Sequence, residues 1–206
     1  YRYVGLLPES DDAWSWTKNF IKSADTGISN IKVEIEEVER ANNRTLPFET
    51  VWFQHSLSDE NSWLDFSEES KGTQMLFQMA APIYNALKLG SLLLIDELDS
   101  SLHVSIGNTI IQLFNNPKTN PHNAQLIFTT HDTNLLGTIP DEPALRRDQI
   151  WFTEKDKEGG TNLYPLTDYK PRKSENLERG YLQGRYGAIP FLGDFNQLTE
   201  EIHGET

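Results

Sequence analysis

Leu92-Leu93-Leu94-Ile95-Asp96-Glu97 is the stretch that most constrains the fold, because four apolar residues are followed at once by two acids. A continuous apolar run predicts a strand buried on both faces, which is typical of a parallel sheet covered by helices. The acids then stand at the carboxyl end of the strand, where open α/β sheets bind their ligands. Asp96 there can hold Mg²⁺, and Glu97 can orient or deprotonate a water that attacks a phosphoryl group. The alternative is a strand that ends in acids with no catalytic role.

Helices and a second strand flank this stretch in the order expected for an α/β fold. A long apolar-rich helix is predicted over residues 74–89, and Gly90 ends it in the C-cap position. Apolar residues at helical spacing predict a helix over 104–115, and the run AQLIFTT at 124–130 predicts a second buried strand. Strand, helix and strand in this order predict a right-handed crossover.

The rest of the chain is predicted to carry antiparallel strands and a further helix. Residues 31–39 alternate apolar and acidic side chains, which predicts a strand with one solvent-exposed face. The other predicted elements are a helix over 11–24, a turn at 42–44, a strand over 50–55 antiparallel to the first, a hairpin of 149–154 and 161–166, and a partly helical stretch over 175–189.

Composition excludes several classes of protein. The 206 residues include 5 Trp, 7 Tyr and 10 Phe, which excludes intrinsic disorder for most of the chain. No apolar run approaches the roughly 20 residues of a membrane-spanning helix, so no membrane partner is expected. With no cysteine, the chain has no disulfide, thiolate metal site or cysteine nucleophile. No signal peptide is visible, and we expect a cytoplasmic location. The net charge of −13 repels nucleic-acid phosphates on average.

A second polar segment follows the second buried strand. Phe128-Thr129-Thr130-His131-Asp132 ends that strand, and parallel strands end at the same edge of their sheet. We therefore expect His131 beside the two acids, where it can contact a γ-phosphate. The alternative is a surface histidine at the boundary of a strand and a loop.

Two further segments carry candidate binding residues. Ser70 can cap the long helix and Gly72 permits a close backbone approach, while the free N–H groups of the first turn, with Lys71, form an anion site. An ordinary helix N-terminus is the alternative. Asp99 follows the acids in Leu98-Asp99-Ser100-Ser101-Leu102-His103. Asp99 and the two serines either face a partner subunit across a nucleotide, or Asp99 caps the next helix.

Taken in order, these segments resemble the second half of an ABC-type ATPase head. The resemblance is to the SMC and double-strand-break-repair ATPases and to the bacterial AAA-type ATP-binding proteins of phage-defence systems. Residues 70–74 resemble the ABC signature motif and residues 92–97 resemble Walker B. Residues 98–101 are similar to the D-loop, and His131 is similar to the switch histidine.

The resemblance also implies a domain organisation. Residues 181–190, YLQGRYGAIP, resemble the tail of the defence-associated group, so the resemblance spans roughly residues 25–192. It implies an N-terminal helical segment at 1–24 that continues from a missing upstream part. Residues 25–192 are then the C-terminal half of the ATPase domain, with a mostly parallel sheet, flanking helices and antiparallel strands, and residues 193–206 are an acidic tail.

The resemblance implies a mechanism in which two heads sandwich two ATP molecules with Mg²⁺. The residues that contact the γ-phosphate of the nucleotide held by the opposite protomer are then Ser70, Lys71, Gly72 and Thr73. In the same scheme Asp96 serves Mg²⁺, Glu97 polarises the attacking water, His131 senses the γ-phosphate and Asp99 couples the two sites.

Two departures from the family pattern qualify this scheme. Residues 69–72 read Glu-Ser-Lys-Gly where transporters carry a Leu-Ser-Gly-Gly type of run, which favours the SMC-like branch. The chain also contains no G-x-x-x-x-G-K-[ST] motif, the Walker A loop that cradles nucleotide phosphates. We therefore expect the chain to be the C-terminal portion of a longer ATPase, and to bind ATP weakly or not at all by itself.

Two other functions stay open at this point. In a metal-dependent nuclease or phosphatase, Asp96, Glu97 and Asp99 would form a metal cluster with His103 or His131. In a non-catalytic dimerisation or partner-binding module, the contact surface would be the acidic face 34–39 with four tryptophans: Trp14, Trp16, Trp52 and Trp63.

Basic residues in the C-terminal third suggest a DNA, RNA or effector contact, with a solvated surface as the alternative. They are Arg146, Arg147, Lys170, Arg172, Lys173, Arg179 and Arg185. The defence resemblance implies a nuclease or other toxic effector as a partner.

Overall fold

The computed structural model describes residues 10–24, 26–40, 44–56, 62–137 and 143–190. The chain divides into two compact units, residues 1–132 and 133–206. The expected acidic tail at 193–206 lies outside the described residues. None of the helices in the described ranges has the length and hydrophobicity needed to cross a lipid bilayer.

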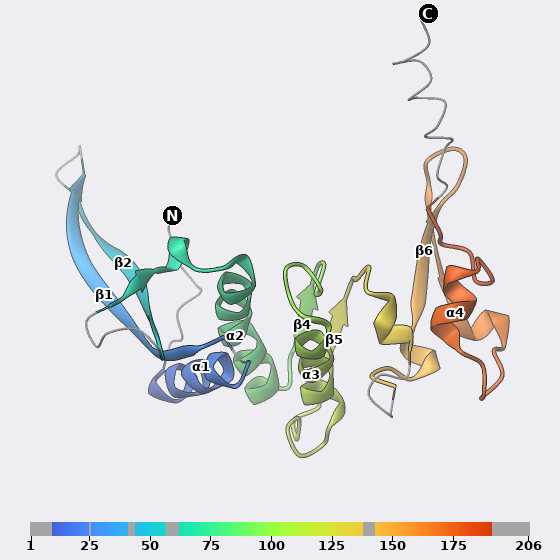
Figure 1. The fold of residues 1–206 in the computed structure, drawn as a ribbon, viewed down its shortest axis with the longest axis horizontal. Coiled ribbons are helices and arrows are strands. Elements are labelled where there is room, and N and C mark those ends of the chain that lie inside the picture. Colours follow the sequence, from blue (N-terminus) through green and yellow to red (C-terminus); the bar gives the residue numbers. More distant parts are fainter. Residues whose placement is uncertain (1–9, 25, 41–43, 57–61, 138–142, 191–206) are drawn as a thin grey trace, which may run out of the picture. The chain divides into compact units, whose positions relative to one another are not determined.

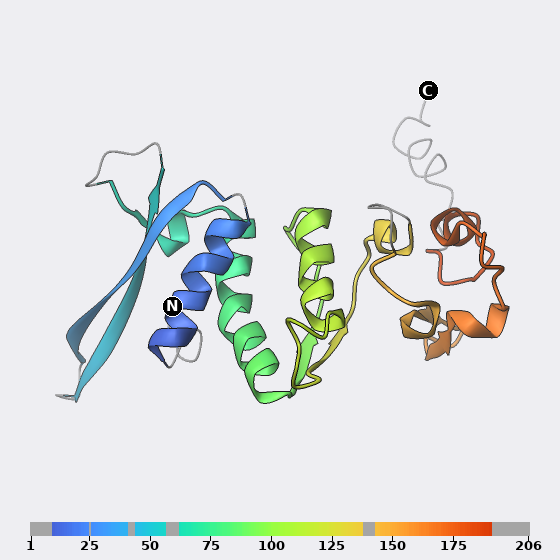
Figure 2. The same cartoon turned by 90° about the horizontal axis from the view of Figure 1, so that it is seen from below.

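Two helices lie side by side in the first unit (Figures 1 and 2). Helix α1 (Asp11–Ser23) begins at Ser10, whose hydroxyl accepts a hydrogen bond from the N–H of Ala13. Helix α2 (Lys71–Leu89) begins three residues earlier than predicted, because Ser70 caps it from outside the predicted range. Gly90 ends α2 in the left-handed conformation, which confirms its predicted C-cap role.

An antiparallel sheet packs against these helices. It consists of β1 (Ile28–Arg40), β2 (Arg44–His55) and the short β3 (Leu64–Asp65), followed by the 3-10 helix η1 (Phe66–Glu68). Strands β1 and β2 pair with Ile31 opposite Phe53, which confirms the predicted antiparallel pair. The predicted turn at 42–44 falls mostly outside the described residues. The shared core of this sheet and the helices consists of Ile21, Ile28, Ile31, Val51, Phe53, Phe66, Leu76 and Phe77.

A parallel pair of strands carries the predicted chemistry. Strand β4 (Leu92–Ile95) pairs with β5 (Gln125–Phe128) in register, Leu92 opposite Gln125, and helix α3 (Val104–Asn115) joins them. The buried side chain of Asn120 closes the connection, since it bonds backbone groups of Phe114 and Ala124. The predicted strand–helix–strand unit is therefore confirmed.

The prediction that β4 and β5 are buried on both faces is wrong. Helix α3 packs against β5 on one face of the pair (Figure 2). The side chains of alternate residues, which share the opposite face, are exposed to solvent. Leu92 is 52% exposed, Leu94 66% and Ile127 58%. Continuous apolar runs are typical of parallel strands that are covered by helices on both faces. In the described residues, a helix covers only one face of this pair.

The second unit is built around a hairpin. Strands β6 (Trp151–Lys155) and β7 (Thr161–Pro165) are antiparallel, as predicted. Within its described residues, 133–137 and 143–190, the helical elements are η2 (Thr133–Leu136), η3 (Arg147–Gln149), η4 (Leu166–Tyr169) and α4 (Leu177–Leu182). Its core consists of Ile150, Phe152, Leu166 and Tyr186.

Candidate functional site

The carboxyl ends of β4 and β5 bring the two acids next to Thr129. The register places Ile95 opposite Phe128, so the next residues of the two strands, Asp96 and Thr129, are also neighbours. The hydroxyl of Thr129 donates to Oδ1 of Asp96 at 2.5 Å and accepts from the N–H of Glu97 at 2.8 Å. One hydroxyl group therefore contacts both acidic residues, one through its side chain and the other through its backbone.

Glu97 has an unusual backbone conformation. Its φ of 54° lies in the left-handed region, which is disfavoured for a residue with a β-carbon. The carbonyl oxygen of Glu97 accepts from the N–H of Ser100 at 2.9 Å, so the chain turns sharply after the strand. The side chain is exposed, and it makes no hydrogen bond or ion pair within the described part of the chain. The carboxylate is therefore accessible to a water molecule.

Asp99 links the loop after β4 to the loop after β5. Its Oδ1 accepts from the N–H of His131 at 3.2 Å. Burial works to raise the pKa of Asp99, but hydrogen bonds from the Thr130 hydroxyl and from backbone N–H groups, with nearby His131, outweigh it and lower the pKa. Asp99 is therefore held ionised. The alternative in which Asp99 caps α3 is wrong, because His103 is the N-cap and accepts from the N–H of Ser105.

The N-terminus of α2 holds the signature-like residues. Oγ of Ser70 accepts from the N–H of Thr73 at 3.1 Å, and the two hydroxyls are 2.9 Å apart. Ser70 and Lys71 are exposed, whereas Thr73 is 6% exposed. Thr73 therefore supports Ser70 from below the surface. Nζ of Lys71 donates to Oε1 of Gln74 at 3.2 Å.

Two contacts fix this helix start within the unit. A β-carbon built on Gly72 would lie 2.7 Å from the carbonyl oxygen of Ser101, so the signature-like segment touches the loop after the acids. Behind it, Nε2 of His55 and Oε1 of the buried Glu69 are 2.8 Å apart. No hydrogen bond within the described ranges joins residues 70–73 to Asp96, Glu97 or His131, so the candidate residues form two clusters.

Sequence reasoning missed three of these contacts: the Thr129 hydroxyl on the acids, the Ser101 carbonyl against Gly72, and His55 with Glu69. Thr129 was visible as a polar residue at a strand end next to the acids, and that position is the signal that could have identified it. Ser101 acts through its backbone, and the pairing of His55 with Glu69 joins distant segments. No local pattern in the sequence marks either of those two contacts.

The metal cluster of the nuclease alternative is not formed. Among the described residues, no group of three or more His, Asp or Glu side chains is arranged to hold one metal ion. Asp96 nevertheless fits Mg²⁺ as a single ligand, because Mg²⁺ takes one or two carboxylates and completes its shell with water and substrate phosphates. Its carboxylate is exposed at the strand end, with Oδ1 oriented by Thr129.

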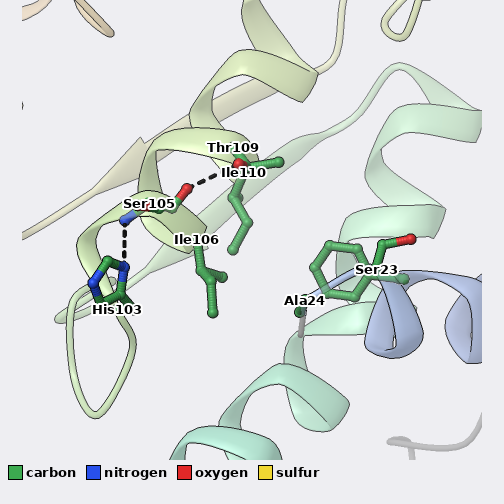
Figure 3. A pocket seen from close by; sticks show the side chains of 8 residues that line it. Ser23, Ala24, His103, Ser105, Ile106, Thr109 and Ile110 are labelled. Carbon is green, nitrogen blue, oxygen red and sulfur yellow. Dashed lines mark hydrogen bonds between the residues drawn. The ribbon is translucent and has the colours of Figure 1, made fainter. Parts of the chain in front are cut away.

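A cavity of about 600 Å³ lies elsewhere in the first unit, between α1 and α3. Figure 3 shows Ile106 of α3 pointing into the space that separates it from Ser23 and Ala24 at the end of α1. The lining includes none of the residues assigned to nucleotide or Mg²⁺, and His103 is the one lining residue named above as a ligand, in the metal-cluster alternative.

Some residues of the tryptophan surface and of the basic cluster make contacts within the chain itself. Trp14 is half-buried and packs edge-on against Phe77 of the core, with ring centroids 6.4 Å apart. In the basic cluster, Arg146 pairs with Asp148 at 2.8 Å. Arg147 donates to the backbone oxygens of Pro171 and Lys173, and Arg185 pairs with Glu175.

Comparison with known families decides the class of protein. Residues 17–137, more than half of the chain, match the family described as "AAA domain, putative AbiEii toxin, Type IV TA system". The chain belongs to this AAA domain family. The matched residues include all eight predicted site residues, from Ser70 to His131, so both clusters are parts of the AAA domain. The expected AAA-type family is confirmed, and with it an ATPase-type domain.

Other comparisons add little to the family assignment. No curated protein matches this AAA domain. A solved structure described as "Structural biochemistry of ATP-driven dimerization and DNA stimulated activation of SMC ATPases" is similar at a TM-score of 0.48 and 13% identity. The similarity covers 87% of this chain and 94% of that one.

Proposed function

We propose that residues 25–192 are the C-terminal half of an SMC-like ABC ATPase head that binds and hydrolyses ATP as a dimer. The supporting observation is the pair of contacts at the ends of β4 and β5, where the Thr129 hydroxyl joins Asp96 to Glu97 and the Asp99 carboxylate accepts from the N–H of His131. An acidic pair and a histidine on neighbouring parallel strands is an arrangement suited to phosphoryl transfer, which depends on positioning and charge stabilisation.

Each side chain in the cluster then has a distinct task. Asp96 holds Mg²⁺, which when bound neutralises charge on the phosphate oxygens. Glu97 uses its free carboxylate to orient the attacking water and to accept its proton. His131 contacts the γ-phosphate. Asp99, ionised and bonded to the backbone of His131, connects the histidine loop to the turn that holds Glu97.

The signature-like cluster serves the nucleotide of the opposite protomer in this proposal. Exposed Ser70 and Lys71 stand at the start of a 19-residue helix, where the partial positive charge of the helix terminus favours an anion. Gly72 brings this helix start against the loop of Ser101, and buried Thr73 fixes the Ser70 hydroxyl. The two sites of a dimer are thereby connected through each protomer.

The phosphate-binding loop belongs to another part of the complete protein in this proposal. A part with a strand and helices of its own would cover the exposed face of β4 and β5, including Leu92, Leu94 and Ile127. Parallel sheets occur with both faces covered, so an open face of this kind favours a further layer.

The family description names a toxin of a toxin–antitoxin system, and we extend the proposal accordingly. We propose that the ATPase is the sensor or motor subunit of a cytoplasmic phage-defence system with a nuclease or other effector as its partner. Contact with DNA or RNA through the exposed basic residues of the second unit belongs to the same proposal.

The test compares ATP hydrolysis by the 206-residue chain with hydrolysis by the natural protein that includes the phosphate-binding loop. We expect hydrolysis by the longer protein alone. Glu97→Gln should reduce its kcat by at least about a hundredfold and accumulate an ATP-bound dimer, since a general base contributes about 10²–10⁴-fold. Glu37→Gln, a change of an exposed acid on β1, is the matched control and should leave kcat unchanged.

Two outcomes would overturn the proposal. Unchanged hydrolysis in Glu97→Gln would remove the assigned role of the acidic pair. Hydrolysis by neither protein would favour the non-catalytic partner-binding module.

A further inference from the structure

Thr129 occupies a central position at the strand ends. It follows β5 directly, and its N–H donates to the carbonyl oxygen of Ile95 at 3.1 Å. Its own carbonyl oxygen accepts from the N–H of Leu98 at 3.0 Å. The backbone of Thr129 therefore bonds the residue before the acidic pair, Ile95, and the residue after it, Leu98.

The side chain of Thr129 makes two further hydrogen bonds to the acidic pair. Its hydroxyl proton goes to Oδ1 of Asp96, and its oxygen accepts the N–H of Glu97. A hydroxyl has one proton to give, and an ionised carboxylate only accepts, so the direction of both bonds is determined. Oδ1 of Asp96 thus accepts the Thr129 hydroxyl, which orients the carboxylate and leaves the other carboxylate oxygen for a ligand.

The same hydroxyl bears on the conformation of Glu97. The positive φ of Glu97 is unfavourable for a residue with a side chain. Such a conformation persists only where hydrogen bonds and packing around it hold the backbone in place. The bond from the N–H of Glu97 to Thr129 and the bond from Ser100 to the Glu97 carbonyl hold the two sides of this residue. Without the hydroxyl, one of the two bonds is lost.

We propose that Thr129 is a positioning residue that orients the Asp96 carboxylate and the Glu97 backbone together through its single hydroxyl. This role rests on the proposed ATPase function. Thr129 touches neither nucleotide nor water in this role. It acts by limiting how far either acid departs from its working orientation, as partners of metal-binding carboxylates do in other proteins.

The matched variants are Thr129→Val and Thr129→Ser. Valine keeps the branched shape and removes the hydroxyl, whereas serine keeps the hydroxyl and removes the methyl group. In the natural protein that contains the phosphate-binding loop, we expect valine to lower kcat about 10–100-fold and to raise the half-saturating Mg²⁺ concentration similarly. KM for ATP should change little, because Thr129 does not bind the nucleotide. Serine should restore most of both values.

Amide hydrogen exchange in the 206-residue chain gives a readout that does not depend on activity. The N–H of Glu97 should exchange markedly faster in Thr129→Val and at the wild-type rate in Thr129→Ser. Unchanged exchange in the valine variant would overturn the proposal, because the hydroxyl would then not hold the Glu97 backbone.

The kinetic outcomes separate this inference from the function on which it rests. If Glu97→Gln abolishes hydrolysis while Thr129→Val changes neither kcat nor the Mg²⁺ dependence, the ATPase function stands and the role of Thr129 is overturned. If the wild-type natural protein hydrolyses no ATP, both are overturned. The role of Thr129 would also be overturned if the serine variant lost as much activity as the valine variant. The hydroxyl would then not be the group on which activity depends.

Discussion

Gly72 and Ser101 approach so closely that a β-carbon on Gly72 would lie 2.7 Å from the Ser101 carbonyl oxygen. Ser101 itself has a φ of 61°, in the region that disfavours side chains, and such a conformation persists where the surrounding structure holds it. The start of α2 and the loop after β4 are therefore in direct backbone contact, and this contact joins the two clusters of candidate residues.

Gly72→Ala should destabilise the protein through this contact. Alanine is better than glycine in a helix by about 1 kcal/mol, so a gain would be expected from helix propensity alone. The clash with backbone should outweigh that gain and give a net loss of about 1–3 kcal/mol in the free energy of unfolding. Urea unfolding followed by circular dichroism measures the difference.

Gly107→Ala is the matched control for this substitution. Gly107 also lies in a helix, α3, but a β-carbon there would meet no atom within 4 Å. The free energy of unfolding should rise by up to about 1 kcal/mol in this variant. If both substitutions changed the free energy of unfolding equally, the close approach of Gly72 to Ser101 would not contribute to stability.

Local sequence patterns were sufficient to predict most elements of the fold. These elements depend on interactions between residues close in the sequence. Examples are the alternation at 31–39, the helix caps Ser70 and Gly90, and the apolar runs before Asp96 and Thr129. That the two strands end at the same edge also follows from such runs. The predicted second strand runs on to residue 130, however, whereas β5 ends at Phe128, so the sequence does not predict Thr129 beside Asp96.

Features that depend on distant segments could not be predicted in this way. An apolar run predicts that a strand is suited to burial, but it does not say whether a second layer is present, and Leu94 is 66% exposed. The left-handed φ of Glu97 arises from bonds to Thr129 and Ser100 rather than from the preference of glutamate. The pairing of His55 with Glu69 depends on how β2 packs beside α2.

Glu175 should make the stability of the second unit sensitive to acid. Its carboxylate accepts from the hydroxyl of Tyr186 at 2.7 Å and from the N–H of Arg172 at 3.1 Å, and it pairs with Arg185. These contacts, led by the Tyr186 hydroxyl, lower the pKa of Glu175 to about 2.

Because the folded pKa lies below the unfolded value, Glu175 stabilises the fold above that unfolded value, about 4.3. This contribution is lost as the pH falls from there toward about 2. Thermal unfolding of Glu175→Gln should accordingly show a weaker dependence on pH across this window. Glu158→Gln, a change in the exposed hairpin turn, is the control, and an identical pH dependence in both variants would contradict the prediction.

Asn120→Ala should be strongly destabilising. The Asn120 amide donates to the carbonyl oxygens of Phe114 and Ala124 and accepts from the N–H of Ala124, all in a buried setting. Removal leaves buried backbone groups without these partners, at a cost of about 2–4 kcal/mol in the free energy of unfolding. Asn116→Ala removes one exposed bond to the N–H of Lys118 and should cost less than about 1 kcal/mol. Chemical unfolding of both variants tests this, and similar costs would show that the connection of α3 to β5 does not depend on Asn120.

The exposed face of β4 and β5 gives the sharpest test of whether a further layer covers the sheet in the natural protein. In the 206-residue chain, Leu94→Ser should change the free energy of unfolding by no more than about 0.5 kcal/mol, because Leu94 is largely exposed. It should also reduce the binding of a hydrophobic dye. Leu98→Ala, at a position 1% exposed, is the buried comparison and should cost about 2–5 kcal/mol.

In the longer protein that the proposed function expects, Leu94→Ser should instead cost at least about 1.5–3 kcal/mol, the worth of burying a leucine side chain. The difference between the two proteins measures the burial that the additional part supplies. An equally small effect in both would mean that the face stays open, and the proposed arrangement, in which the part with the phosphate-binding loop covers β4 and β5, would then be wrong.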